Sequence, residues 1–129
     1  MQMSDLLANA TDQERGADLE LIAPWDGSKT GMVLTIVGPD SDTARRADLA
    51  MMDALADMAD DRGMVTAEQR QKASLDALAK RVIRWQVEDE GKPVAFTHKA
   101  VTTLLRVQWV RAQVDAFAGD HRNFVPGAR

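Results

Sequence analysis

The sequence predicts a mainly helical protein, a small three- or four-helix bundle that follows a short N-terminal β-hairpin. Three observations predict this class. Apolar side chains over residues 41–118 recur every three or four positions, which is the spacing of one helix face. Ser or Thr stands where each of these runs begins, as helix N-caps do. Two short apolar stretches before residue 38 are separated by turn-forming residues, which is typical of a hairpin.

The length of 129 residues is that of one domain. We expect a flexible N-terminal arm over residues 1–16, a single domain over residues 17–124 and a frayed tail over residues 125–129. Within the domain, the hairpin covers residues 17–38 and the helical bundle covers residues 41–118. The arm holds one apolar pair, Leu6 and Leu7, among polar residues, and such chain ends are commonly poorly ordered.

The hairpin is predicted from alternation and from turn chemistry. Leu19 and Leu21 alternate with acidic residues, as in a strand with one buried face. Residues 24–29 read Pro-Trp-Asp-Gly-Ser-Lys, in which Asp-Gly readily supplies a positive φ. Residues 32–37 are apolar and rich in β-branched side chains. Because a lone hairpin is marginal in water, we expect the helices to support it.

Three helix starts are predicted from N-cap residues. Ser41 precedes the first helix, which runs to about residue 62 and ends before Gly63. Thr66 opens the second helix, with Gln69 at capping-box spacing. Thr97 opens the third, which either continues to residue 118 or kinks near residues 106–108. The predicted helix caps are therefore Ser41, Thr66 and Thr97.

The core is predicted from the apolar stripes of these helices. In the second helix the stripe continues at helical spacing to residue 85, and in the third a hydrophobic staple joins the residue before the cap to the fourth residue after it. The predicted core residues are Leu55, Leu78, Val82, Trp85, Phe96, Val101, Leu104, Val114 and Phe117.

The sequence contains no motif that is typical of a catalytic or cofactor-binding site. There is no Cys, and the two histidines, His98 and His121, have no partner at metal-ligand spacing. No glycine-rich nucleotide loop and no nucleophile elbow is present. Four aspartates between residues 53 and 61 share one helix face, and we interpret them as a solvated surface in preference to a cation site. We expect no enzyme activity, no cofactor and no metal.

The distribution of charge bears on partners. Residues 1–63 carry 13 acids and 5 bases, a sum of −8, whereas residues 64–129 carry 7 acids and 11 bases, a sum of +4. The two halves can attract each other within one chain or between copies, so self-association is expected as one kind of contact. Clustered Lys and Arg are absent, so we expect no nucleic-acid binding. No apolar run approaches the length of a membrane span, and the first residues do not follow the pattern of a secretory signal, so we expect no membrane partner.

Candidate partner-binding residues are large, apolar and hard to bury. Trp25 lies in the predicted turn, where it is either exposed to a partner or folded inward. Methionines in the first helix suit a surface that accepts several apolar partners, although they also fill ordinary cores. Trp109 has the same two interpretations. The predicted partner-binding residues are Trp25, Met51, Met52, Met58 and Trp109.

Residues 85–124 contain a series of packing and turn residues in a particular order. They are Trp85, Gly91, Pro93, Phe96, Thr97, Trp109, Val110, Arg111, Gln113, Val114, Asp115, Asp120, Arg122, Asn123 and Phe124. Upstream lie Leu-Glu-Leu at residues 19–21, Thr-Gly at residues 30–31 and Gly-Pro-Asp-Ser-Asp at residues 38–42. The order of these residues resembles that of the tail assembly chaperones of long-tailed bacteriophages.

The resemblance implies a non-enzymatic assembly function in the cytoplasm of the bacterial host. Proteins of that family bind the tape measure protein, keep its long hydrophobic helices soluble and recruit tail tube subunits. The expected partners are therefore the tape measure protein and the tail tube protein. Two alternatives remain open: a structural virion component, such as a head–tail connector or minor tail protein, and a small regulator that binds one host protein.

Overall fold

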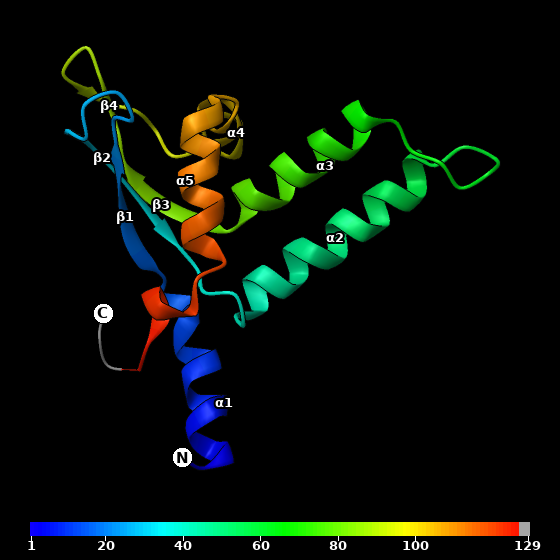
Figure 1. Ribbon diagram of the computed structural model, residues 1–129, viewed down its shortest axis with the longest axis horizontal. Coiled ribbons are helices and arrows are strands. Elements are labelled where there is room, and N and C mark those ends of the chain that lie inside the picture. Colours follow the sequence, from blue (N-terminus) through cyan, green and yellow to red (C-terminus); the bar gives the residue numbers. More distant parts are fainter. Residues whose placement is uncertain (127–129) are drawn as a thin grey trace.

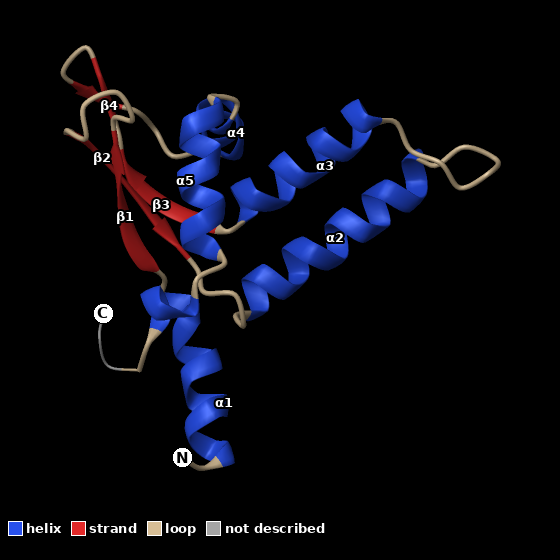
Figure 2. Cartoon of the chain, viewed as in Figure 1, coloured by secondary structure: helices blue, strands red, loops and turns tan. Residues whose placement is uncertain are grey.

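The structure is a computed structural model that describes residues 1–126, and it has a mixed α+β fold (Figures 1 and 2). The prediction of a mainly helical bundle is wrong, because a three-stranded antiparallel sheet and a two-stranded sheet stand beside the helices. The elements are α1 (Met3–Asp12), η1 (Gln13–Arg15), β1 (Ala17–Ile22), β2 (Lys29–Ile36), α2 (Asp42–Met58), α3 (Ala67–Lys80), β3 (Val82–Gln86), β4 (Glu88–Asp89), β5 (Lys92–Pro93), α4 (His98–Leu105), α5 (Gln108–Ala118) and η2 (His121–Phe124).

The predicted hairpin of residues 17–38 is confirmed as β1 and β2, which pair antiparallel. Its turn is closed by hydrogen bonds from the Ala23 N–H to the Ser28 carbonyl (2.8 Å) and from the Gly27 N–H to the Ala23 carbonyl (2.9 Å). Gly27 has φ 75°, the conformation that its place in this turn requires. We expected helices alone to support the hairpin. A third strand, β3, also supports it, because β3 pairs with β2 on the side opposite β1.

The strand β3 is where the predicted helical bundle of residues 41–118 fails. Val82 and Trp85 were expected on the second helix, but the helix ends at Lys80 and both residues lie in β3. Leu34 of β2 pairs with Trp85, and the Val37 N–H donates to the Arg81 carbonyl (3.0 Å). Pairing with a strand nearly 50 residues earlier therefore overrides a local spacing that also fits a helix.

The helices α4 and α5 cover one face of the three-stranded sheet, whereas α2 and α3 form a helical hairpin that extends away from it (Figure 1). Between the sheet and its covering helices lies the main hydrophobic cluster. From the sheet, Leu21, Leu34 and Ile36 are fully buried, and from the helices Leu105 and Val114 are fully buried. We call the sheet with α4 and α5 the body.

Most predicted core residues lie in or against this cluster. Leu78, Val82, Val101 and Val114 are buried, and Trp85, Leu104 and Phe117 are partly buried against the cluster.

Two core predictions fail. Phe96 is 42% exposed, because it lies in the extended segment before α4 and meets the rim of the body, where its ring packs edge-on against Trp85 at 5.7 Å. Leu55 is half-buried and lies outside the cluster, because α2 belongs to the projecting hairpin.

All three predicted helix caps are confirmed. The hydroxyl of each accepts a backbone N–H three residues on: Ala44 for Ser41, Gln69 for Thr66 and Ala100 for Thr97.

The third predicted helix was expected either to continue to residue 118 or to kink near residues 106–108, and the structure shows the kink. α4 ends at Leu105, α5 begins at Gln108, and the Arg111 guanidinium donates to the Leu105 carbonyl across the kink (3.2 Å). The first predicted helix is shorter than expected, since α2 ends at Met58.

The chain ends also differ from expectation. Most of the predicted flexible arm of residues 1–16 is helical, as α1 and η1. Of the predicted tail, residues 127–129 lie outside the described residues. Within residues 1–126 no helix has the length and apolar character needed to cross a membrane.

Candidate functional site

Two of the predicted partner-binding residues meet at the end of the body. Trp25 lies in the β1–β2 turn with 74% of its surface exposed, and Trp109 lies in the first turn of α5. Their ring centroids are 5.8 Å apart and the planes are 83° apart, an edge-to-face contact. We call these two residues the tryptophan pair.

The tryptophan pair is positioned by the side chain of Gln113, which bonds to the backbone of β1 as a neighbouring strand would. The Gln113 amide of α5 accepts from the Ile22 N–H (3.0 Å) and donates to the Ile22 carbonyl (2.7 Å). This clamp fixes the middle of α5 against the end of β1, and Trp109, one helical turn before Gln113, is thereby held beside the turn. The turn is further shaped by Asp26, whose carboxylate accepts the Ser28 N–H (3.0 Å) and whose pKa is lowered by that hydrogen bond.

The predicted methionines lie on a different surface, along α2. Met52 is 62% exposed on the outward side of the helix, next to Leu49, which is 46% exposed. With Ala56 they follow helical spacing, and we call these three residues the α2 face. Met51 is half-buried toward α3, where the Ser74 hydroxyl lies 3.9 Å from its sulfur, and Met58 is half-buried near the helix end. The tryptophan pair and the methionines therefore belong to separate parts of the molecule.

Sequence reasoning missed a third surface, on α1. Within Met3–Asp12 no residue is buried. Met3, Leu6 and Leu7 are 75%, 56% and 59% exposed, and their spacing places them on one side of the helix. We call them the α1 stripe. The signal in the sequence was the spacing of Met3 from the Leu6-Leu7 pair, which is that of an amphipathic helix.

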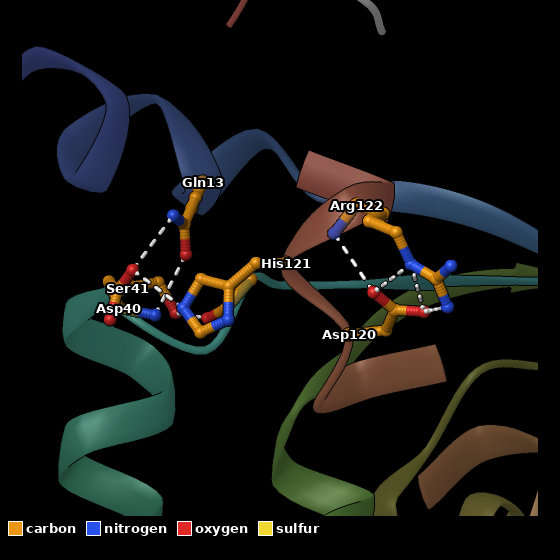
Figure 3. A network of polar contacts seen from close by, with 7 residues as sticks. Gln13, Asp40, Ser41, Asp120, His121 and Arg122 are labelled. Atoms are coloured by element: carbon orange, nitrogen blue, oxygen red, sulfur yellow. Dashed lines mark hydrogen bonds and ion pairs between the residues drawn. The ribbon is translucent and has the colours of Figure 1, made fainter. Parts of the chain in front are cut away.

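A buried glutamine attaches α1 to the rest of the chain. The Gln13 side chain is fully buried; its amide donates to an Asp40 carboxylate oxygen (3.1 Å) and its carbonyl oxygen accepts the Asp40 N–H (2.7 Å). The Gly38 N–H donates to the Gln13 backbone carbonyl (3.1 Å). Nε2 of His121 lies 3.1 Å from the same Asp40 carboxylate, so residues from both ends of the chain meet at the start of α2 (Figure 3). We call this network the Gln13 joint.

Figure 3 also shows a compact ion pair next to the joint, between Asp120 and Arg122. The Arg122 guanidinium makes a 2.8 Å contact with the Asp120 carboxylate, and the Arg122 N–H donates to it at 3.0 Å. These bonds lower the pKa of Asp120 and raise that of Arg122. The pair shapes the turn into η2 and is exposed, so it contributes little to stability.

A groove of about 710 Å³ runs between α3 and α5, and we call it the α3/α5 groove. Apolar side chains from both helices line it, including Leu75, Leu78 and Ala112. Four charged residues border it, namely Glu68, Arg70, Arg111 and Asp115. Gln71, Ser74 and Gln108 also line it, so polar and charged side chains outnumber apolar ones in this groove.

Two titratable side chains meet between α3 and α4. His98 of α4 contacts the Asp76 carboxylate of α3. Partial burial alone would raise the pKa of Asp76, but the hydrogen bond and charge of His98, together with Lys80, lower it. Among residues 1–126, no group of three or more His, Asp or Glu side chains is placed to hold a metal ion. Of the four aspartates between residues 53 and 61, Asp60 lies in the loop after α2, where its carboxylate accepts the Arg62 and Met64 N–H groups.

No protein-family model, no curated protein and no solved structure matches this chain.

Proposed function

We propose that this protein is a non-enzymatic tail assembly chaperone of a long-tailed bacteriophage, which binds the tape measure protein and helps to recruit tail tube subunits in the cytoplasm of the bacterial host. The resemblance of residues 85–124 to that family supports the proposal. The observation that carries it is the tryptophan pair, because Trp25 keeps 74% of its surface exposed in a turn that is held by hydrogen bonds. A large aromatic side chain presented in this way is typical of a contact with another protein.

In the proposed mechanism the protein binds and holds its client without changing it chemically. An apolar face of a client helix rests against the tryptophan pair, which is already positioned by the Gln113 clamp, so little ordering cost is added on binding. The α2 face offers a second apolar contact on the same chain. Each contact is small, so the affinity of one copy is weak. Several copies on one long client then bind with high avidity.

The first experiment measures where the protein goes during infection. Quantitative mass spectrometry compares purified phage particles with the infected-cell lysate that produced them. An assembly chaperone leaves before the particle is complete, so we expect an abundant protein in the lysate and none in particles. A fixed copy number in particles overturns the proposal and supports a structural virion component in its place.

The second experiment tests the tryptophan pair. Trp25→Ala removes an exposed side chain, so we expect the free energy of unfolding to change by less than about 1 kcal/mol. Binding to the co-expressed tape measure protein should weaken by roughly 2 kcal/mol, about thirtyfold, as for a binding hot spot. Met64→Ala is the matched control, because Met64 is 62% exposed and lies in the α2–α3 loop. Unchanged client binding by a folded Trp25→Ala protein removes the pair from the client site.

A further inference from the structure

Two aspartates lie along one side of the α2 face. Asp53 follows Leu49 by four positions and Asp57 follows Asp53 by four, so their side chains are neighbours on the helix surface, and both are exposed. Among residues 1–126 neither carboxylate takes part in an ion pair. The α2 face therefore joins exposed apolar side chains, Leu49 at 46% and Met52 at 62%, to negative charge that no described residue neutralises.

The place of these aspartates in the helix is unfavourable for the free chain. Like charges four positions apart repel each other. Asp57 also lies in the last turn of α2, where the helix dipole is negative and favours bases, yet that turn contains no basic residue. A positive charge supplied by another molecule would relieve both effects.

Negative charge extends over the outer part of the projecting hairpin, which lies away from the sheet (Figure 1). Residues 47–61 contain five aspartates and no base. Asp48 is paired with Arg81, just after α3 (2.7 Å), and no base of α3 forms an ion pair with the other four in the part of the chain that the structure describes. The nearest bases along the chain, Arg46 and Arg62, lie at the two ends of this stretch. A partner that approaches the α2 face therefore meets an excess of negative charge.

This charge narrows the kinds of partner that the α2 face can take. Nucleic acids and anionic membrane surfaces are themselves negative, so the aspartates repel them. A second copy of this chain is also repelled, because among residues 1–126 the other exposed apolar helix face is the α1 stripe, and α1 contains Asp5 and Asp12 and no base. Two α2 faces would likewise set acids against acids. The complementary partner is a different protein that brings bases.

We propose that the α2 face docks an amphipathic helix of a partner protein that carries Lys or Arg beside its apolar stripe. Leu49 and Met52 contact the apolar stripe, and Asp53 and Asp57 pair with two bases one helical turn apart. This inference rests on the proposed function and deepens it, because it names the chemistry of the client segment that the α2 face takes. The contact is weak in one copy, since the aspartates are exposed and salt screens them.

Fluorescence anisotropy of a labelled peptide tests the charge preference with the full chain. The peptide is an amphipathic helix of about 18 residues, long enough to be helical, with Leu and Ala on one side and Lys beside them. A second peptide has Glu in place of each Lys. We expect the Lys peptide to bind at least about tenfold more tightly at low salt, and the difference to shrink as salt is added. Equal binding of the two peptides overturns the proposal.

Two double variants test the α2 face itself. Asp53→Asn with Asp57→Asn removes both charges at nearly constant shape, so we expect the Lys peptide to bind about three- to tenfold less tightly at low salt. Leu49→Ser with Met52→Ser removes the apolar contact and should weaken binding by about tenfold or more at any salt concentration. Circular dichroism checks that both variants are folded. Unchanged binding by either variant overturns the proposal.

A matched control separates the α2 face from the net charge of the chain. Asp89→Asn with Glu90→Gln removes the same number of acids from the exposed end of the β4–β5 hairpin. This control should bind the Lys peptide like the unaltered chain. An equal loss of affinity in the control and in the Asp53→Asn, Asp57→Asn variant would mean that the peptide responds to net charge alone, which overturns the proposal.

The same variants distinguish this inference from the proposed function. Trp25→Ala should bind the Lys peptide normally, because the tryptophan pair belongs to the body. If the co-expressed tape measure protein binds the Asp53→Asn, Asp57→Asn variant as well as it binds the unaltered chain at low salt, this inference fails and the proposed function stands. If the Lys peptide binds as expected but the protein has a fixed copy number in particles, the proposed function fails and the α2 face remains a site for a basic helix.

Discussion

The body and the projecting elements are built on different packing principles. In the body, large side chains such as Leu34 and Leu105 are fully buried between sheet and helices. In α2 the buried residues are Ala44 and Ala47, and within α1 none is buried. Alanine lets two helices approach closely but removes little apolar area from water. The body therefore supplies most of the stability, while the projections carry most of the exposed apolar side chains.

The largest effect expected from this difference is in the core of the body. Leu34→Ala removes a fully buried side chain in the middle strand, so we expect it to lower the free energy of unfolding by about 2–5 kcal/mol. Leu49→Ala makes the same chemical change on the α2 face, where the side chain is 46% exposed, and should cost less than about 0.5 kcal/mol. Urea unfolding measures both. Similar costs for the two variants would show that the projections are as important to stability as the body.

A change in stability of intermediate size is expected from removing the helix caps, and it should differ between the two ends of the projecting hairpin. Ser41 lies at the base, is fully buried, donates to the Gly38 carbonyl (2.7 Å) and accepts the Ala44 N–H (3.1 Å). Ser41→Ala leaves buried polar groups without partners, and we expect a loss of about 1–2 kcal/mol. Thr66 caps α3 at the exposed tip, so Thr66→Ala should cost about 0.5–1 kcal/mol. A greater loss at Thr66 than at Ser41, by thermal or urea unfolding, would contradict this order.

The smallest effect concerns pH at the contact between α3 and α4. The pKa of Asp76 is lower in the folded chain than in the unfolded chain. Its contribution to stability is therefore complete above the unfolded value of about 3.9 and is lost as the pH falls through the lower, folded value. Unfolding midpoints of the unaltered chain and of Asp76→Asn should differ slightly at neutral pH and converge in acid. Asp53→Asn, on the exposed surface of α2, is the control; a difference that persists or grows in acid would contradict the assignment.

What the sequence predicted correctly was local. Ser41, Thr66 and Thr97 are recognised because a cap needs its hydroxyl and an N–H three residues on, all within one helical turn. The β1–β2 hairpin is also local, since its turn is six residues long. Features that depend only on neighbouring residues can be predicted without knowing the fold.

What the sequence could not predict depends on contacts between distant residues. Val82 and Trp85 fit a helix face and a strand equally well, and pairing with β2 decides between them. The tryptophan pair requires the Gln113 clamp on Ile22, which spans 91 positions in the chain. Both tryptophans were predicted as partner-binding residues, but no spacing in the sequence indicated that they would meet.

The Gln13 joint restricts which residues can occupy positions 13 and 38, and this restriction would be visible in the sequences of related chains. A Cβ atom added at Gly38 would lie 2.6 Å from Cβ and 2.7 Å from Cδ of Gln13, closer than two carbon atoms that are not bonded to each other approach. Position 38 therefore accepts a side chain only if position 13 gives up its glutamine or shifts it. In any set of related chains that keep this joint, the residues at positions 13 and 38 should vary together, although 25 positions separate them.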